Sequence, residues 1–408
     1  MLKLKRLFGD AEVPKDLALL LFIGGLYSLS IALSNTFVNI FLWKQSGKFL
    51  DIGIYNLAIV VFQPLTFILA GRWAKKIDRV IVLRIGVIFL ALFFMVVLFW
   101  GKGADRHLVM LGSLLGIGYG FYWLAFNVLT FEITEPETRD FFNGFLGTLS
   151  SAGGVIGPIS AGFMITRFES NAGYTLIFAI SLALFALAVV LSFFIKRRPA
   201  RGVYCFFRVM AERKNNINWR YVTNAHFLQG LRDGTFVFII SVFVFIATKS
   251  ELALGTFGLI NSGISFISYT LAGRFIRNSF RKKAMLIGGL ILYGAIFLII
   301  FNFSYPRLLI YAAVIAIAYP MMLVPYFSMT YDVIGKSWKA AEMRIEYVVV
   351  KEVFLNSGRI VSVLSFMAAV AFFNDEKSIP ILLLFIGTGH GLAALIMQHV
   401  KLPHSMES

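Results

Sequence analysis

Residues 69–73 read Leu-Ala-Gly-Arg-Trp, and residues 271–275 read Leu-Ala-Gly-Arg-Phe, 202 positions later. Two further stretches return at nearly the same spacing: Thr36-Phe37-Val38 as residues 235–237, and Thr130-Phe131-Glu132-Ile133 as Thr-Tyr-Asp-Val at residues 330–333. Because the spacing changes by only three residues along this length, the chain contains two copies of one unit. Two tandem halves in an apolar chain are typical of secondary transporters.

The composition places both halves in a lipid bilayer. Of the 408 residues, 59% are hydrophobic and 14% are charged, and the mean hydropathy is +0.81. A soluble domain carries charge on about a quarter of its residues. The 43 Phe residues are explained by helix surfaces that face lipid, so they require no cofactor or nucleic acid.

The apolar residues form twelve segments, each about 20 residues or slightly longer, which is enough to cross the hydrocarbon core as a helix. We predict an all-α integral membrane protein with two six-helix bundles, residues 1–195 and 221–408, joined by a cytoplasmic linker at residues 196–220. The predicted spans are residues 17–43, 50–71, 80–101, 107–130, 141–165, 172–195, 221–247, 253–273, 284–304, 307–333, 345–373 and 379–400.

The loops on the two sides of the predicted bundle differ in their content of Lys and Arg. The side with both termini carries 27 of them, whereas the other side carries 8. The positive-inside rule therefore places both termini and the linker in the cytoplasm, and we expect a multi-pass protein of the plasma membrane. This topology and the attraction of anionic lipids explain the net charge of +17, so no nucleic-acid partner is expected.

The residues that carry most enzyme chemistry are sparse in this chain. It holds one cysteine, Cys205, and five dispersed histidines. A single cysteine forms no internal disulfide, and dispersed histidines make no metal cluster. The sequence also offers no Ser/His/Asp constellation, so we expect no metal, no cofactor and no enzymatic activity.

Two motifs resemble those of the major facilitator superfamily. Residues 71–79 resemble its G-x-L-A-D-R-x-G-R loop, and residues 273–281 are a weaker copy. Residues 144–162, which read Gly144-x8-Gly153-x3-Gly157-Pro158-x2-Ala161-Gly162, are similar to the antiporter motif of the superfamily. The resemblance extends over the whole chain in length, helix count and internal repeat. It implies the twelve-helix, two-bundle fold, transport by alternating access, and a place near the bacterial drug/metabolite antiporters.

The chain departs from these motifs at informative positions. The loop motif has an acidic residue at its fifth position, where this chain has Lys75, and Asp78 stands where a glycine is usual. The carboxylate contact of the motif is therefore lost or relocated. Gly112 occupies the place of a buried arginine that the proton-coupled drug exporters often carry in the fourth helix. The resemblance alone does not make this chain a drug:proton antiporter.

Equivalent acids end the fourth and tenth predicted helices, and we expect them to pair with the basic loops as latches. Glu132 would pair with Arg72 or Arg79, and Asp332 with Arg274 or Arg281; the alternative is that both acids are solvated helix ends. The Gly-rich fifth helix serves helix packing and rocking, or a specific antiport role. The predicted gating residues are Gly71, Arg72, Asp78, Arg79, Glu132, Arg139, Arg274, Arg281, Asp332, Gly153, Gly157 and Pro158.

Ionisable residues inside the predicted spans gather in the second half. Arg232 and Asp233 lie in the seventh span, and Glu346, Lys351, Glu352 and Arg359 lie in the eleventh. At 1.5 Å per residue, Arg232 and Glu352 would lie roughly 12–17 Å deep, where charges persist because they pair or work. We predict pairs of Arg232 with Glu352 and of Asp233 with Lys351. The cluster is either structural or mechanistic; Asp233, Glu346 and Glu352 are the proton-coupling candidates.

The remaining polar and aromatic residues at mid-membrane predict an aromatic, weakly polar cavity between the halves, with its charge on the second-half wall. Two prolines in the tenth helix indicate kinks that let it bend as a gate. For any single aromatic residue the alternative is a place in the core or against lipid. The substrate-binding candidates are Arg232, Lys351, Arg359, Asn35, Asn39, Tyr119, Tyr122, Trp123, Asn127, Gln229, Tyr319, Tyr326 and Asn356.

These features predict proton-coupled export or flipping of an amphipathic or anionic compound by alternating access. One alternative is a proton symporter that imports a small polar or anionic solute. Another is a membrane receptor or scaffold that moves nothing. The expected partners are a small-molecule or lipid-like substrate, protons and membrane lipids, and we expect the chain to act as a monomer.

Overall fold

The computed structural model describes residues 15–133, 136–168, 171–196, 202–276, 278–301 and 304–401. Within these ranges, the side chains of residues 131–145, 274, 278 and 376 lie outside the description. All regular elements of the described residues are helical. The long helices are α2 (Lys15–Ser46), α3 (Phe49–Lys76), α4 (Arg79–Trp100), α5 (Leu108–Ile133), α6 (Pro136–Arg167), α7 (Ala172–Ser192), α9 (Ile217–Thr248), α10 (Glu251–Phe275), α11 (Arg281–Gly294), α13 (Tyr305–Gly335), α14 (Arg344–Phe372), α15 (Asp375–Gly387) and α16 (Gly389–Gln398).

Twelve passes across the molecule are formed by these helices. Eleven stretches of the described residues are long and apolar enough to span a membrane, and one of them contains both α4 and α5 with the 3-10 turn η1 (Gly101–His107) between them. Two predicted single spans are broken: α11 continues as α12 (Phe297–Ile300), and α15 continues as α16. The twelve-helix, all-α prediction is confirmed.

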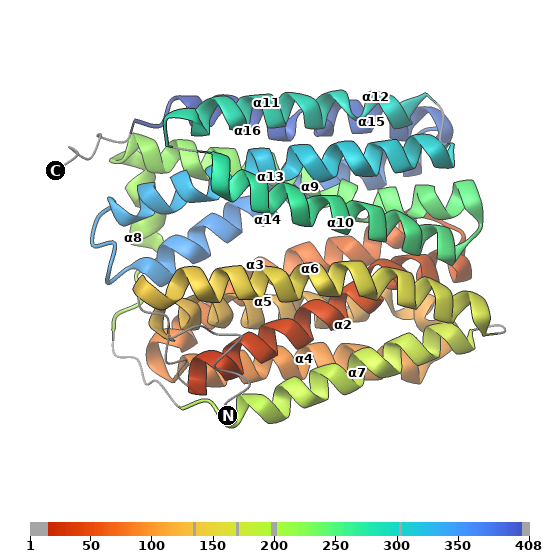
Figure 1. Cartoon of the computed structure of the whole chain (residues 1–408), viewed down its shortest axis with the longest axis horizontal. Coiled ribbons are helices and arrows are strands. Elements are labelled where there is room, and N and C mark those ends of the chain that lie inside the picture. Colours follow the sequence, from red (N-terminus) through yellow and green to blue (C-terminus); the bar gives the residue numbers. More distant parts are fainter. Residues whose placement is uncertain are drawn as a thin grey trace.

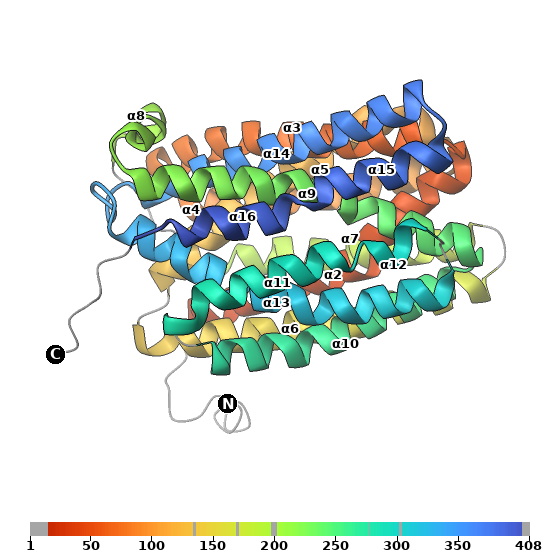
Figure 2. The ribbon, with the colours of Figure 1, turned by 90° about the horizontal axis from the view of Figure 1, so that it is seen from above.

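The helices lie roughly side by side in two groups, α2–α7 and α9–α16 (Figure 1). The view from above shows the same helices running along one common direction (Figure 2). One end of the molecule carries the linker helix α8 (Phe206–Ala211), the turn η2 (Glu212–Lys214) and the start of α9. We call it the linker end, and we call the end with η1 the opposite end.

Contacts between the two groups are made by α6 with α10, by α3 with α14, and more sparsely by α2 with α9. Small residues allow the α6–α10 contact to be close. A Cβ on Gly162 would lie 2.6 Å from the carbonyl oxygen of Glu251, and one on Gly255 would lie 2.5 Å from that of Pro158. Within the first group, Gly153 and Gly157 pack in the same way against α2. This is the packing that small residues supply where lipid provides little hydrophobic drive.

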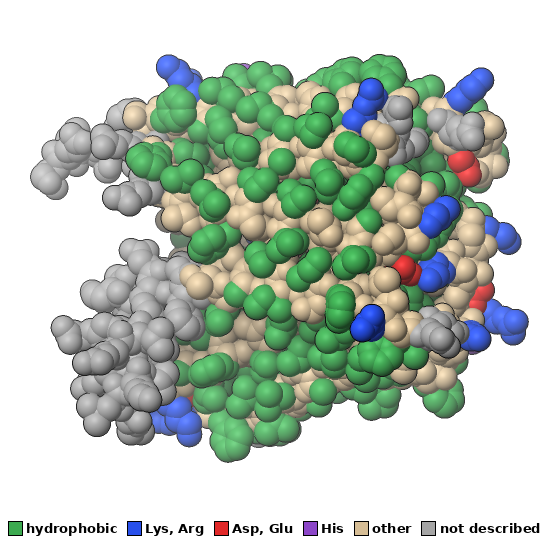
Figure 3. Space-filling model, turned by 45° about the vertical axis from the view of Figure 1, so that its right-hand side comes forward, with side chains coloured by type: hydrophobic (Ala, Val, Ile, Leu, Met, Phe, Trp, Pro, Cys, Tyr) green, Lys and Arg blue, Asp and Glu red, His purple; other side chains and the backbone are tan. Residues whose placement is uncertain are grey.

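Polar side chains cap the N-termini of several helices. Asp78 accepts a hydrogen bond from the backbone N of Val80 at 2.7 Å and so caps α4, and Ser250 does the same for α10 through the backbone N of Ala253 at 3.2 Å. Between the ends, hydrophobic side chains cover the flank of the molecule (Figure 3). Most of the Lys, Arg, Asp and Glu side chains visible in this view lie toward the end on its right. The apolar band has the surface that a bilayer requires.

Candidate functional site

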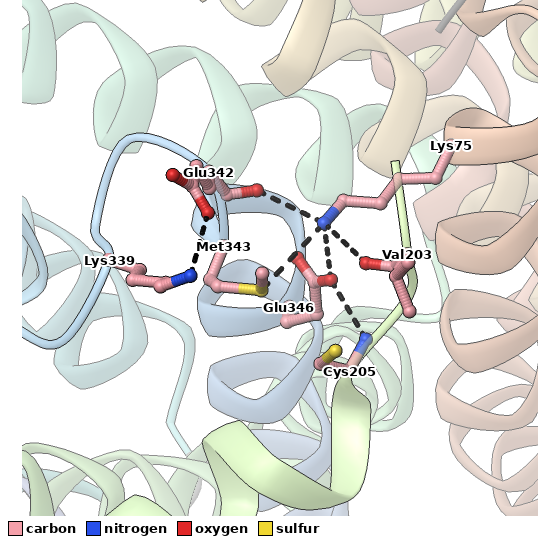
Figure 4. A network of polar contacts seen from close by, with 7 residues as sticks. All are labelled: Lys75, Val203, Cys205, Lys339, Glu342, Met343 and Glu346. Atoms are coloured by element: carbon pink, nitrogen blue, oxygen red, sulfur yellow. Dashed lines mark hydrogen bonds and ion pairs between the residues drawn. The ribbon is translucent and has the colours of Figure 1, made fainter. Parts of the chain in front are cut away.

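The two groups are tied at the linker end by a buried ion pair between Lys75 of α3 and Glu346 of α14, which we call the linker-end pair (Figure 4). The Lys75 ammonium also donates to the backbone oxygens of Val203 at 3.2 Å and Glu342 at 3.0 Å. Glu346 accepts from the backbone N of Cys205 at 3.0 Å. The backbone of the linker therefore passes beside the pair and forms hydrogen bonds with both of its charged side chains.

Glu346 lies in the first turn of α14, two residues from its start, and not among the deep charges with which we grouped it. The helix begins at Arg344, one residue earlier than predicted, and the close packing of α3 against α14 brings Lys75 to this turn. The carboxylate contact of the loop motif is thus relocated: the cation now comes from the loop, and the acid comes from the other half.

The linker residue Tyr204 fills the space beside Gly71. A Cβ on Gly71 would lie 2.8 Å from the Tyr204 hydroxyl and 3.0 Å from a methyl of Val349. Burial, and then the negative charge of Glu346, raise the pKa of the Tyr204 phenol. Gly71 is therefore required for the linker to lie here, whereas a Cβ on its repeat copy Gly273 would meet no atom of the described residues within 4 Å.

One of the predicted acid–loop pairs is present. Arg281 donates to Asp332 at 2.9 Å, and both side chains are partly exposed. The counterpart in the first half, Glu132 with Arg72 or Arg79, depends on Glu132, whose side chain lies outside the described residues, as do those of Arg139 and Arg274. Arg72 is exposed, and Asp78 serves as a helix cap. The gating roles of all these residues stay predictions.

A second ion pair joins the two groups at the opposite end, and we call it the opposite-end pair. Lys44 of α2 lies 2.8 Å from Glu251 of α10, and the hydroxyl of Tyr174 in α7 donates to the same carboxylate oxygen at 2.9 Å. Sequence reasoning missed this pair. Both charges were visible at span ends on one side of the membrane, but 207 positions separate them and no repeat relates them.

Asp233 is the centre of a buried polar cluster in the second half. Its carboxylate accepts hydrogen bonds from Gln229 at 3.3 Å and from Tyr319 of α13 at 3.1 Å. The Arg232 guanidinium lies 3.8 Å away, and Nε2 of His390 in α16 lies 3.3 Å away. Four elements of the second half therefore meet around one acid, since the charge of Arg359 in α14 also acts on it.

The predicted pairs of Arg232 with Glu352 and of Asp233 with Lys351 are wrong. Lys351 lies 3.1 Å from its own neighbour Glu352, and Asp233 takes its partners from α9, α13 and α16. The reason is reach: a long side chain folds back onto the adjacent residue of its own helix. Lys351 and Glu352 thus neutralise each other within α14, and His390 instead of Lys351 lies beside Asp233.

His390 was not among the predicted site residues. It lies between Gly389 and Gly391 in an apolar span, and this neighbourhood is the signal that could have found it. Glycine is needed there because a Cβ on Gly389 would lie 2.3 Å from the carbonyl oxygen of Leu228 in α9. The resulting close approach of α16 to α9 carries the fully buried imidazole to Asp233.

Several buried polar atoms of this cluster have no hydrogen-bond partner among the described residues. They are Nε of Arg232, Nε of Arg359, Oε1 of Gln229, the hydroxyl of Tyr326 and Nδ1 of His390. A buried donor without a partner costs about 1–3 kcal/mol, so such a group indicates a ligand or water that belongs there. Most of these atoms belong to groups that can donate a hydrogen bond, and the oxygens of an oxyanion would accept those bonds.

The first-half candidates form an aromatic wall opposite this cluster. Tyr119 of α5 donates to Asn35 of α2 at 3.3 Å, and the charge of Arg359 in the second half acts on the same phenol. Asn39 accepts from Asn56 at 2.8 Å, which holds α2 and α3 together. Arg359 is thus a second-half cation whose charge reaches an aromatic residue of the first half.

The other aromatic candidates of α5 pack within the first half. Trp123 donates through Nε1 to the hydroxyl of Tyr27 at 2.9 Å, and Tyr122 stacks on the Tyr27 ring at 4.1 Å between centroids. Tyr122 is almost fully buried, whereas Asn127 is half-buried. Tyr27, which the sequence did not single out, is the hub of this wall.

Known proteins resemble this chain along its whole length. The profile of the Major Facilitator Superfamily matches residues 20–343. A protein of Bacillus subtilis (strain 168), described as uncharacterized protein YqgE, is 62% identical over 401 residues, which are 98% of this chain and 93% of the relative. Multidrug resistance protein 1 of the same strain is 28% identical over 152 residues, or 37% of each chain.

Solved structures of transporters share the fold. The human organic anion transporter MFSD10 (TETRAN) matches with a TM-score of 0.69 at 14% identity, over 94% of this chain and 100% of that chain. The nucleoside transporter NupG matches with a TM-score of 0.70 at 14% identity, over 95% of this chain and 100% of that chain. At these identities the likeness shows the fold alone.

Proposed function

The chain belongs to the Major Facilitator Superfamily, and we propose that it is a proton-coupled membrane transporter that moves an amphipathic anionic compound by alternating access. The observation that carries this proposal is the half-satisfied cluster around Asp233, in which buried donors lack partners. An anionic group held by Arg232 and Arg359 would supply the missing acceptors. The aromatic wall around Tyr119 and Tyr27 would hold the apolar part of the compound.

The proton would bind at Asp233. In the described arrangement the carboxylate lies beside His390 and takes the attraction of Arg232 and Arg359 for itself. Protonation would cancel its charge and free these cationic groups for the substrate anion. By linkage, a substrate anion bound beside the same groups would favour retention of the Asp233 proton, so proton and substrate would move together in the direction of the proton gradient. Lys351 and Glu352 neutralise each other, so we rank Glu352 below Asp233 as the coupling acid.

Alternating access would use the two inter-half ion pairs as latches. Both the linker-end pair and the opposite-end pair are formed here, so one ion pair joins the halves at each end. Opening toward one side then requires one pair to break while the other holds. Asp332 with Arg281 would steady the linker end within the second half.

The sidedness is part of the proposal. The first bundle (1–195) and second bundle (221–408) would rock about the substrate, and the linker at 196–220 would lie in the cytoplasm. The excess of Lys and Arg in the loops at that side supports this placement, as does the exposure of Arg72 there. We further propose that the protein acts as a monomer in the plasma membrane.

Transport into proteoliposomes tests this function. A pH gradient is imposed, and uptake of a fluorescent amphipathic carboxylate is followed in wild type, in Asp233→Asn and in Arg359→Gln. We expect Asp233→Asn to lose movement driven by the gradient while exchange at equal concentrations survives, and Arg359→Gln to lose both. Glu342→Gln is the matched control, because that side chain is 64% exposed at the linker end.

A purely structural cluster would behave differently. Removal of one buried charge would then cost about 3–5 kcal/mol, and thermal stability would fall together with every transport mode. Full gradient-driven movement in Asp233→Asn and in Glu352→Gln would end the coupling proposal. Movement that ignores the gradient in wild type would end it as well.

A further inference from the structure

A pocket at the opposite end of the molecule is formed by three segments of the first half. Its volume is about 340 Å³, and it lies between the end of α2, the turn η1 and the residue that precedes α7. Its polar lining consists of Lys44, Gln45, Lys102, Asp105, Arg106 and Asn171. This space is separate from the cluster around Asp233, since none of these residues belongs to it.

The pocket concentrates positive charge where the chain otherwise has little. The loops at this end carry only eight Lys and Arg, and three of them line this one pocket together with a single acid. Gathering like charges raises the electrostatic energy of the empty site, and an anion lowers it. The pattern is not a general feature of the loops, because the other five cations lie elsewhere along them.

The frame of the pocket is held by the backbone. Gln45 donates to the carbonyl oxygen of Gly101 at 3.2 Å and accepts from the backbone N of Asp105 at 3.4 Å, so both of its amide atoms tie η1 to α2. The 21-residue helix α7 begins directly after Asn171, whose side chain does not cap it. The positive end of that helix dipole therefore lies beside the cations.

We propose that this pocket binds an oxyanion, a phosphate or carboxylate group, and that the bound anion competes with Glu251 for Lys44. The same lysine lines the pocket and forms the opposite-end pair, with its Nζ 2.8 Å from Glu251 and its side chain 40% exposed. A second anion beside this ammonium repels the Glu251 carboxylate. Occupancy of the pocket thus loosens the contact of α2 with α10 and favours opening at the opposite end.

Phosphate binding by the purified full-length protein tests the site. The apparent melting temperature is followed against inorganic phosphate, with chloride at matched ionic strength as reference. We expect a saturable rise in wild type and a loss of affinity of about tenfold or more in Lys102→Gln/Arg106→Gln, because two of three cations are gone. Lys48→Gln/Lys377→Gln removes the same charge from exposed positions outside the pocket and should leave the curve unchanged.

The competition has its own test. Glu251→Gln frees Lys44, so phosphate affinity should rise, by about three- to tenfold, in this variant. The same substitution in a Lys44→Gln background should change nothing. No phosphate-specific rise in wild type, or an equal rise in Lys102→Gln/Arg106→Gln, would overturn the site; an unchanged affinity in Glu251→Gln would overturn the competition.

An experiment in lipid vesicles distinguishes the two possible sources of the oxyanion, a lipid headgroup and a dissolved anion. The protein is reconstituted in phosphatidylcholine vesicles with and without phosphatidylglycerol, and its melting temperature is compared for wild type and Lys102→Gln/Arg106→Gln. A rise that depends on these two cations and on phosphatidylglycerol identifies a lipid headgroup as the occupant. A rise that depends on dissolved phosphate in pure phosphatidylcholine identifies a free anion.

Discussion

The two inter-half ion pairs use the same chemistry in different surroundings. At the linker end, the side chains of Lys75 and Glu346 are 7% and 0% exposed; the linker backbone adds two hydrogen bonds, and the backbone of Glu342 adds a third. At the opposite end, the side chains of Lys44 and Glu251 are 40% and 10% exposed. Separating a buried ion pair is costly because each charge is left without a partner away from water. In a partly exposed pair, water or ions can replace the partner. The linker end should therefore hold while the opposite end yields first.

The largest effect should come from Glu346→Gln. It leaves the Lys75 ammonium buried with backbone oxygens alone, at an expected cost of about 3–5 kcal/mol. Thermal unfolding in detergent should show a large fall in melting temperature, and Lys75→Met/Glu346→Gln should recover most of it. In the single variant, Cys205 should also react faster with a thiol reagent, since the linker is released. An unchanged melting temperature and labelling rate would mean that the pair holds nothing.

A smaller effect is expected from Gly71→Ala, which tests the linker-end packing rather than its charges. The added methyl would lie 2.8 Å from the Tyr204 hydroxyl, and overpacking of this kind costs about 1–3 kcal/mol. Gly273→Ala, at the repeat copy, meets no atom within 4 Å and should be nearly neutral. Gly71→Ala/Tyr204→Phe should recover part of the loss. Equal effects of the two glycine variants would show that Tyr204 does not press on Gly71.

Glu251→Gln should lower stability less, by about 1 kcal/mol, because Lys44 is partly solvated. The contrast with the linker end lies in salt: added NaCl should shrink the difference between wild type and Glu251→Gln but leave that of Glu346→Gln in place. Unfolding curves at low and high NaCl measure both. A salt response of equal size in the two variants would remove the distinction between a buried and a partly exposed pair.

The smallest effect should come from Asp332→Asn. Its pair with Arg281 is exposed and lies within one half, so we expect about 0.5 kcal/mol or less in stability. Its role as a latch would instead appear as altered accessibility of cysteines introduced at the linker end. If both stability and accessibility match wild type, Asp332 is simply a solvated helix end.

Much of the fold could be predicted because the signals are local. Apolar runs of sufficient length specify spanning helices whatever their neighbours, and the repeated Leu-Ala-Gly-Arg stretch showed the two copies. Lys75 was recognised as a departure, yet its partner Glu346 was grouped with the deep charges, because it fell inside the eleventh predicted span although only one residue from its start. The breaks between α11 and α12 and between α15 and α16 left no clear mark either.

The candidate site could be predicted only in part. Arg232, Asp233 and the charged residues of the eleventh span were predicted as site residues because a charge inside a membrane is energetically costly. Which of these charges pair depends on how each helix is rotated and on which helices are in contact. His390 reaches Asp233 because Gly389 lets α16 approach α9, and Lys44 reaches Glu251 because glycines let α6 approach α10. Neither approach follows from hydropathy.

By itself, then, the sequence determined that this chain is a twelve-helix membrane protein of two related halves, because apolar runs of about 20 residues cross a bilayer as helices that satisfy their own backbone hydrogen bonds. Only the tertiary structure decided which charges pair across the halves and which donors stay unpaired. An ion pair forms over 3–4 Å, whereas its members, such as Lys75 and Glu346, lie 271 positions apart. The distance between them is set by helix packing, which no local pattern encodes.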